Sequence, residues 1–312
     1  MNGKLRPTND LMFKKTFGSI GNEDIIKGFA ADFFMVTSGK IIVANPYSIE
    51  AYEELDKNGG KTTMLRETLA DITFRAEIES LTMEMQVSKT DYFDRRMLYY
   101  ACDKYRSEYS AQQEPEPEEK QEDGEKEKPN RYKSLRPLYA LDIIGYNYFP
   151  DDYAFHKFDL YDIDHKIKFT DKKTGKDLFA ISCFEYKKPC VEIANHRYWQ
   201  MYFQGLDVPN EAPSYIKRAE QLLDLAKLSE KERKMYAECE KRKADMDAYI
   251  STAWSDGEAS GVELGKAQER TKTLCSAAVL LRKTDSWEMV KSVFPDITED
   301  EIKQVTKNAK LL

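Results

Sequence analysis

The chain has 312 residues, of which 41% are hydrophobic and 33% are charged, and its formal net charge is −7 at pH 7. This length allows one sizeable hydrophobic core or two modest ones, and no apolar run approaches the roughly 20 residues that a membrane-spanning helix needs. The N-terminus lacks the apolar centre of a signal peptide, and the five cysteines form no Cys-x-x-Cys pair, which argues against a zinc centre or a disulfide framework. We therefore expect a soluble, cytoplasmic protein with reduced thiols.

The first predicted elements are two helices and a short strand. In "PTNDLMFKKTFG", a Thr-Asn-Asp sequence offers an N-cap directly before apolar residues, which predicts a helix. A glycine-containing break at 18–21 separates it from a second helix, which we expect from Asn22 to about Val36. The segment "KIIVANPYS" then reads as a short strand.

Two alternating stretches, "TMLRETLADITFRAEI" and "ESLTMEMQV", follow one another and predict an antiparallel hairpin. In the second stretch Leu81, Met83, Met85 and Val87 alternate with Thr82, Glu84 and Gln86, the pattern of a half-buried strand. Opposed residues of an antiparallel pair share a face. If residue 77 pairs with 78, Asp71 lies opposite Glu84; if the turn lies one residue later at each end, Asp71 lies opposite Gln86. Either register gathers Asp71, Glu84 and Gln86 on one face.

A helical period begins at "KTDYFDRRMLYYACDKYRSEYSAQQ", where Thr90 or Asp91 can cap the start. The predicted apolar stripe of this helix consists of Phe93, Leu98, Ala101, Tyr105 and Tyr109. Its basic flank consists of Arg95, Arg96, Lys104 and Arg106. This flank suits contacts with phosphates, and it equally suits an ordinary solvated helix face.

An acidic segment at 112–130 interrupts the helical pattern. It holds eight acidic residues and three lysines, so it contributes −5 to the net charge and leaves about −2 for the rest of the chain. Without aromatic residues it cannot bury a core, and we predict a disordered loop. The overall charge is therefore a poor guide to nucleic-acid binding, because the charge near the site decides it.

The remaining chain reads first as strands and then as helices. Strands are predicted at "LRPLYALDIIGYNYF", "FHKFDLYDI" and "DLFAISCFEYKKP", and after residue 191 the composition favours helices almost without a break. Near the end, Thr298 and Glu301 form a sequence resembling a capping box. We expect a domain at 1–190, a helical extension at 191–255 and a helical tail at 256–312, with the helical C-terminal region as the candidate surface for a homodimer.

The chemistry of the hairpin face allows two interpretations. Two nearby carboxylates repel one another and raise each other's pKa unless a cation lies between them, and Mg²⁺ prefers such oxygen ligands. A metal-bound water is acidified, which supplies a nucleophile without a histidine, and Gln86 can orient that water but cannot act as a base. The other interpretation is an ordinary solvated strand face, where Asp, Glu, Gln, Thr and Arg are all common.

Several segments resemble the PD-(D/E)XK nuclease superfamily, and more closely the recombination-promoting nucleases of the Rpn type, which are also described as transposases. The resemblance rests on Asp71, its 13-residue spacing to "Glu84-Met85-Gln86", and the following "Arg96-Met97-Leu98-Tyr99-Tyr100". It extends to "PTNDLMFKKTFG", "PLYALDIIGYNYF", "CFEYKKP" and the glycine-punctuated "DGEASGVELGKAQE", and so covers most of the chain.

The resemblance implies an α/β fold, with a restriction-endonuclease-like core (a mixed sheet flanked by helices) followed by an α-helical C-terminal region. Carried over by position, it makes Asp71 and Glu84 metal ligands and places Gln86 where the superfamily usually has Lys and this subfamily commonly has Gln. It matches Arg96 to the arginine that opens the helix after the motif. It also matches Asp10 to an acidic residue on the first helix that reaches the metal.

The activity implied is that of a Mg²⁺-dependent DNA endonuclease, with Mn²⁺ as a substitute, acting in recombination or on mobile elements and without a membrane partner. The alternative is a catalytically degenerate nuclease fold that binds DNA or serves as a scaffold. The acidic segment departs from the compact connection usual in the family. Loss of the lysine at position 86 removes a cation, which costs roughly 10²–10³-fold in rate if nothing replaces it; Arg75 and Arg96 are the candidates to do so.

Overall fold

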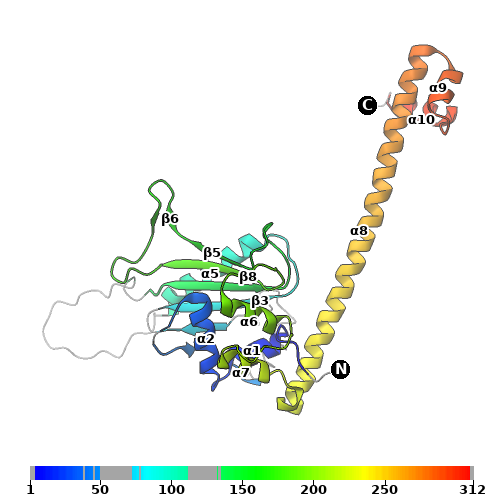
Figure 1. The fold of residues 1–312 in the computed structure, drawn as a ribbon. Helices are drawn as coiled ribbons and strands as arrows, with labels where there is room; N and C mark the ends of the chain where they lie inside the picture. The colour runs from blue at the N-terminus through cyan, green and yellow to red at the C-terminus, as the bar shows by residue number, and fades with distance from the viewer. Residues whose placement is uncertain are drawn as a thin grey trace, which may run out of the picture. The chain divides into compact units, whose positions relative to one another are not determined.

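The computed structural model describes residues 4–37, 39–44, 46–49, 72–76, 79–111, 132 and 135–309. The chain forms two compact units, Met1–Glu240 and Lys241–Leu312, and Figure 1 shows the elements of each. The predicted acidic loop at 112–130 and Asp71 both lie outside the described residues.

A mixed six-stranded sheet forms the centre of the first unit, in the order β1-β2-β3-β4-β8-β5. β3, β4 and β8 are parallel to one another, and the remaining pairs are antiparallel. The strands are β1 (Ile42–Val43), β2 (Ile72–Arg75), β3 (Ser80–Gln86), β4 (Leu138–Ile144), β5 (Phe155–Asp159) and β8 (Phe179–Glu185). A separate two-stranded ribbon consists of β6 (Tyr161–Asp162) and β7 (Ile167–Lys168).

One face of the sheet carries the larger hydrophobic core. The helices on this side are α1 (Asp10–Gly18), α2 (Glu23–Phe34), α6 (Ala194–Phe203) and α7 (Ser214–Gln221), grouped together in Figure 1. Their buried side chains meet Leu81, Met83 and Met85 of β3 in a single cluster. The apolar half of the alternating β3 sequence therefore faces this core, as predicted.

The two N-terminal helices form where the sequence predicts them. The side chain of Asn9 caps α1 by accepting a hydrogen bond from the Leu11 N–H at 3.1 Å, which satisfies one of the backbone donors left over at a helix start. α2 ends where Met35 adopts a left-handed conformation with φ 58°. The start of α1 and the end of α2 are therefore both determined by residues close to them in the sequence.

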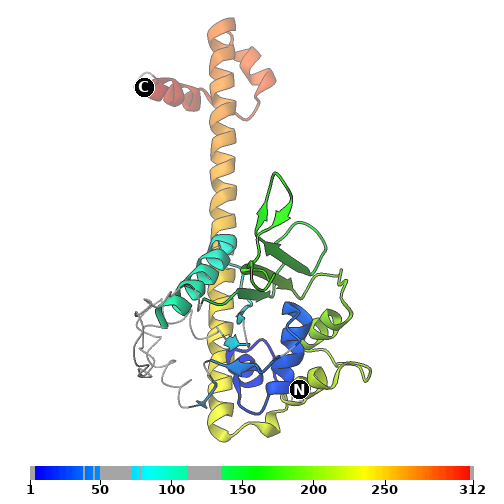
Figure 2. The ribbon, with the colours of Figure 1, turned by 90° about the vertical axis from the view of Figure 1, so that its left-hand side faces the viewer.

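The opposite face of the sheet is covered by α5 (Phe93–Ala111), which runs along this side in Figure 2. Phe93, Met97 and Ala101 pack there on β4 and β8, with Tyr105 against the edge of the cluster. The predicted stripe was wrong at Leu98, which is 51% exposed, because Met97 takes the inward position. Successive helical residues point about 100° apart, so a one-residue error in phase exchanges a buried side chain for an exposed one.

β3 is buried on both faces, which corrects the prediction of a half-buried strand. Every residue of Ser80–Gln86 is buried. The alternation of apolar and polar side chains is real, but the polar side is covered by protein instead of water. A strand with neighbours on both edges, one of them the parallel β4, normally has both faces covered.

The helices that follow β8 pack into the same unit as the sheet. Asp32 of α2 accepts hydrogen bonds from Asn195 (2.8 Å) and Trp199 (2.8 Å) of α6 and from Tyr215 (2.9 Å) of α7. Gly28 allows this packing, since a Cβ there would lie 2.3 Å from the Tyr215 ring. Judged by its packing, the first unit continues to residue 240. The boundaries at 190 and 255, which come from the composition of the sequence, remain predictions of domain organisation.

The helix α8 (Glu230–Thr284) begins after a short turn, η2 (Leu225–Lys227). A capping box joins Ser229 and Glu232, and Lys15 of α1 pairs with Glu232 at 2.6 Å, so the first turn of α8 is bound to the first unit. In the second unit, α9 (Trp287–Val293) and α10 (Glu299–Ala309) pack on the end of α8 around Val290.

The predicted capping box at the start of α10 is confirmed by the hydrogen bonds between Thr298 and Glu301. Among the described helices, none combines the length and the apolarity needed to cross a membrane. The mixed sheet flanked by helices, followed by a helical C-terminal region, confirms the α/β fold expected from the sequence.

Candidate active site

Glu84 and Gln86 lie on the face of β3 that α5 covers. Because Leu81, Met83 and Met85 point into the larger core, the intervening Thr82, Glu84 and Gln86 must point the other way. Glu84 is only 9% exposed and Gln86 only 8% exposed. A solvated strand face is therefore excluded for these two side chains, and their polar groups need partners within the protein.

The register of the hairpin is the first of the two that the sequence allows. Ile72 lies opposite Met83 and Arg75 opposite Ser80, the register in which residue 77 meets 78. Arg75 is consequently paired with the far end of β3, four residues before Glu84, or about 13 Å along the strand. This distance makes Arg75 a poor replacement for a lysine at position 86.

Asp142 of β4 is a site residue that the sequence reading missed. It lies beside Glu84 in the register of the two parallel strands and is 5% exposed. Neighbouring strands are about 4.8 Å apart, so two buried carboxylates stand side by side. The available signal was a single acidic residue within the otherwise apolar run "LYALDII".

α5 brings cations to these carboxylates. Arg96 donates from Nη2 to Glu84 Oε1 at 3.0 Å, and its guanidinium lies 5.1 Å from the centre of the Tyr100 ring. Arg96, Tyr100 and Lys104 are spaced by four residues and share one side of the helix. Arg96 therefore lies beside Glu84, and its catalytic role stays a prediction.

A small cavity lies between α5 and the sheet at this point. Its volume is about 20 Å³, enough for one water molecule. Its polar lining comes from Thr82, Glu84, Asp142, Tyr100 and Lys104, and the apolar remainder comes from residues of α5 and β4. The site thus contains a small cavity whose lining brings together Glu84, Asp142 and Lys104.

The nitrogen and the oxygen of the Gln86 side-chain amide differ in their hydrogen bonding. Its Nε2 donates to Thr90 Oγ1 at 2.7 Å and to the Ser88 carbonyl at 3.3 Å. Its Oε1 is buried and accepts no hydrogen bond from any described residue. Such an acceptor costs about 1–3 kcal/mol, and a water molecule or a hydrated cation would relieve that cost.

The donor set fits a hard divalent cation. Carboxylate and amide oxygens are the ligands that Mg²⁺ takes, usually together with several waters. Within the described part of the chain, no three His, Cys, Asp or Glu side chains are grouped to hold a metal ion. Glu84 and Asp142 therefore need a further ligand, and the predicted one, Asp71, falls outside the described residues.

The structure does not place Asp10 on this face. Asp10 is the exposed first residue of α1, and the buried side chains of α1, including Phe13 and Phe17, belong to the core on the other face. Its predicted role as a metal ligand stays a prediction.

Cys183 of β8 lies beside Asp142, so that Glu84, Asp142 and Cys183 form a row across the three parallel strands. It is fully buried. Burial first, and then the negative charges of Asp142 and Glu185, raise the pKa of its thiol well above the ordinary value. Since only the thiolate is a nucleophile, Cys183 is inert at neutral pH.

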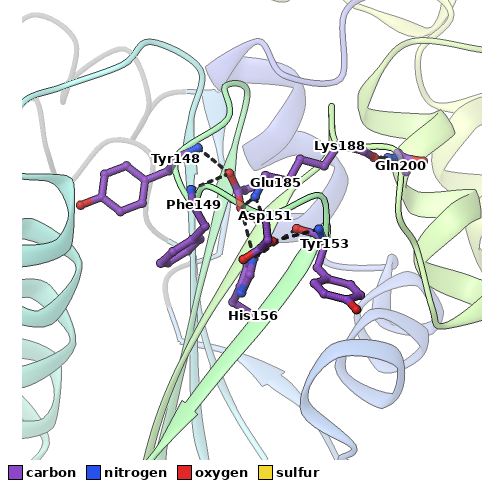
Figure 3. Close-up of polar contacts among 8 residues, drawn as sticks. All are labelled: Tyr148, Phe149, Asp151, Tyr153, His156, Glu185, Lys188 and Gln200. Carbon is purple, nitrogen blue, oxygen red and sulfur yellow. Dashed lines mark hydrogen bonds and ion pairs between the residues drawn. The ribbon is translucent and has the colours of Figure 1, made fainter.

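A second ionic cluster lies at the carboxyl ends of β4 and β8 (Figure 3). Lys188 Nζ is 2.7 Å from Glu185 Oε2, and each side chain is at most 1% exposed. Glu185 also accepts hydrogen bonds from the N–H groups of Tyr148 and Phe149, and His156 Nε2 lies 3.3 Å from its Oε2. The cluster fastens the loop after β4 to the end of β8.

This second cluster contains the literal Glu-x-Lys spelling of the superfamily, at Glu185-Tyr186-Lys187. Lys187 is exposed, whereas Lys188 is buried against the carboxylate. An ammonium and two backbone donors already compensate Glu185, so it has no need of a metal. We expect a structural role for the Glu185 cluster, and the catalytic role of Glu84 and Gln86 stays a prediction.

Comparison with known protein families supports the fold described above. The sequence model of a family described as "PD-(D/E)XK nuclease family transposase" matches residues 7–253, which is most of the chain. No curated protein and no solved structure matches the chain. The match spans both the sheet with its polar row and the first part of α8, and the chain belongs to the PD-(D/E)XK nuclease family transposases.

Proposed function

We propose that this protein is a Mg²⁺-dependent DNA endonuclease, with Mn²⁺ as a substitute, that acts in recombination or on mobile elements. Its catalytic residues would be Asp71, Glu84, Gln86 and Arg96. The metal ligands would be Asp71 and Glu84, joined by Asp142 of β4, with Asp10 as a further one. The observation that carries the proposal is the burial of Glu84 beside Asp142, with the acceptor of Gln86 left unpaired.

Burial of paired carboxylates is costly unless positive charge compensates them. When bound, Mg²⁺ neutralises such oxygens and acidifies a coordinated water. Because the chain belongs to a nuclease family, a bound metal ion is the simplest explanation for acidic side chains in the covered interior of a sheet, where apolar side chains are usual.

The roles of the chain's own residues follow from their chemistry. Glu84 holds the cation, and Gln86 accepts a hydrogen bond from the attacking water through Oε1, which orients the water without taking its proton. Arg96 presents a planar fork of donors that suits a phosphate, and its 3.0 Å contact with Glu84 keeps it at the site before substrate arrives. Water adds to phosphorus and the bond to one ester oxygen breaks, while the proton that the water loses passes to solvent and the departing oxygen takes one from solvent.

Plasmid cleavage tests the proposal. The parent should nick supercoiled DNA with Mg²⁺ or Mn²⁺ and not with EDTA, and Asp71→Ala and Glu84→Ala should each slow nicking by roughly 10²–10³-fold. Asp164→Ala, an exposed residue beyond β6, is the matched control and should cleave like the parent. Equal nicking by all four proteins would show that a contaminant, and not this site, does the cutting.

One observation favours a second candidate function, a degenerate nuclease fold that only binds DNA. Arg96 already pairs with Glu84, and Lys104 lines the same cavity, so two cations balance the two carboxylates without a metal. Calorimetry separates the candidates: absence of Mg²⁺ and Mn²⁺ binding, together with intact DNA binding, would establish the degenerate form. A homodimer through the helical C-terminal region stays a prediction under either function.

A further inference from the structure

We infer that Lys104 of α5 supplies the positive charge that a lysine at position 86 would otherwise provide. The inference rests on the proposed nuclease function and assigns a further residue to the same site. Its starting point is the cavity in which Lys104 meets Glu84 and Asp142. No other lysine lines that cavity among the residues that the structure describes.

The direction of α5 brings the Lys104 ammonium toward the carboxylates. The start of the helix lies at the carboxyl ends of the strands, where Phe93 contacts the Tyr148 ring at 4.9 Å. Its later part lies at the opposite end, where Tyr105 contacts Phe179, the first residue of β8, at 6.0 Å. Side chains on a helix lean toward its N-terminus, so we expect the half-buried Lys104 to lean toward Glu84 and Gln86.

Other cations near the sheet are less well placed for this role. Arg96 is bonded to Glu84, Lys188 is buried against Glu185, and Arg75 lies opposite Ser80 at the far end of β3. Lys104 has a flexible four-carbon stem that can move its charge over several ångströms.

The role that we infer for Lys104 depends on whether a metal ion is bound at the site. In the absence of a metal, Lys104 and Arg96 balance the charges of Glu84 and Asp142. With a divalent cation held by Glu84 and Asp142, the Lys104 ammonium would be repelled from these carboxylates and would be free to turn toward the scissile phosphate. There it stabilises the charge that develops on the phosphate oxygens through charge-assisted hydrogen bonds.

The kinetic test removes the positive charge at position 104 and places one at position 86. Lys104→Gln should lower kcat for plasmid nicking by roughly 10²–10³-fold while KM changes little. Lys104→Arg should keep most of the activity. Adding Gln86→Lys to Lys104→Gln should restore cleavage, because the charge returns to the phosphate from β3. Lys172→Gln, which removes an exposed cation in the turn after β7, is the control and should cleave like the parent.

A second readout separates this role from a structural one. Lys104→Gln should bind Mg²⁺ at least as tightly as the parent in calorimetry, because a competing cation has been removed, even though cleavage falls. Damaged folding would weaken binding and cleavage together, and that result would overturn the inference.

The inference and the proposed function fail in different ways. A parent that cleaves, with Lys104→Gln cleaving equally well or with no rescue by Gln86→Lys, would overturn the role of Lys104 alone. A parent that neither binds a divalent cation nor cleaves would overturn the proposed function, and the role of Lys104 with it.

Discussion

Glu84 and Asp142 lie side by side on adjacent parallel strands, and both are buried under α5. Their carboxylates come from distant parts of the sequence and share one cavity with Lys104. Like charges so close repel unless cations compensate them. We therefore expect a metal ion bound at this pair to change the stability of the fold.

Metal binding should stabilise the protein, and Asp142→Asn should abolish that effect. At 100 times its dissociation constant, Mg²⁺ should contribute about 2.7 kcal/mol, which raises Tm by roughly 5–10 °C for a unit of this size. With EDTA, Asp142→Asn should melt no lower than the parent, because it relieves repulsion with Glu84. Thermal unfolding of both proteins with Mg²⁺ and with EDTA makes the comparison; an unchanged Mg²⁺ shift in Asp142→Asn would remove Asp142 from the site.

The Glu185 cluster should matter for stability. Lys188→Met leaves the fully buried Glu185 carboxylate without its 2.7 Å partner, and such a change costs about 3–5 kcal/mol. Lys187→Met, at the exposed neighbouring position, should stay within about 0.5 kcal/mol of the parent. Urea unfolding measures both. Similar losses in the two variants would mean that the ion pair is not what the buried lysine contributes.

Much of the fold could be predicted because its signals are local. The caps of α1 and α10, the glycine-containing break before α2 and the alternation of β3 each depend on a few neighbouring residues. The hairpin register was narrowed to two choices, and the pairing of Ile72 with Met83 selects one of them.

The remainder depends on contacts between distant segments. Burial of the Glu84 face requires α5 to pack over β3, and the neighbour Asp142 follows only from the parallel pairing of β3 with β4. Alternation reveals that a strand has two different faces, but it does not reveal whether water or a helix covers the polar one. For the same reason Lys104 looked like a residue of a solvated helix flank until the cavity placed it beside Glu84.

The acidic segment at 112–130 gives a prediction about DNA binding. Its deletion removes a net charge of −5 and should tighten DNA binding, most strongly at low salt, where charges are least screened. Halving a loop changes its closure free energy by only about 0.6 kcal/mol, so Tm should change little. Binding isotherms at several salt concentrations test this, and unfolding or aggregation of the shortened protein would instead assign the segment a structural role.

Gln86 provides the sharpest test of which face of β3 carries the function. Gln86→Lys keeps a donor toward Thr90, now 2.7 Å from the amide nitrogen, and adds positive charge beside Glu84. It should therefore keep or raise Mg²⁺-dependent cleavage. Gln86→Leu removes the buried Oε1 that we propose orients the attacking water, and it should lower cleavage.

Met85→Leu is the control for this pair, because Met85 points into the core on the opposite face. The exchange roughly conserves volume and should cost less than about 1.5 kcal/mol, with cleavage unchanged. Initial rates of plasmid nicking, measured beside thermal unfolding, compare the three variants at equal folded concentration. If Met85→Leu reduced cleavage as much as Gln86→Leu while Tm stayed at the parent value, the reactive face of β3 would be the methionine face. Glu84, Asp142 and Lys104 would then be only the polar lining between α5 and the sheet.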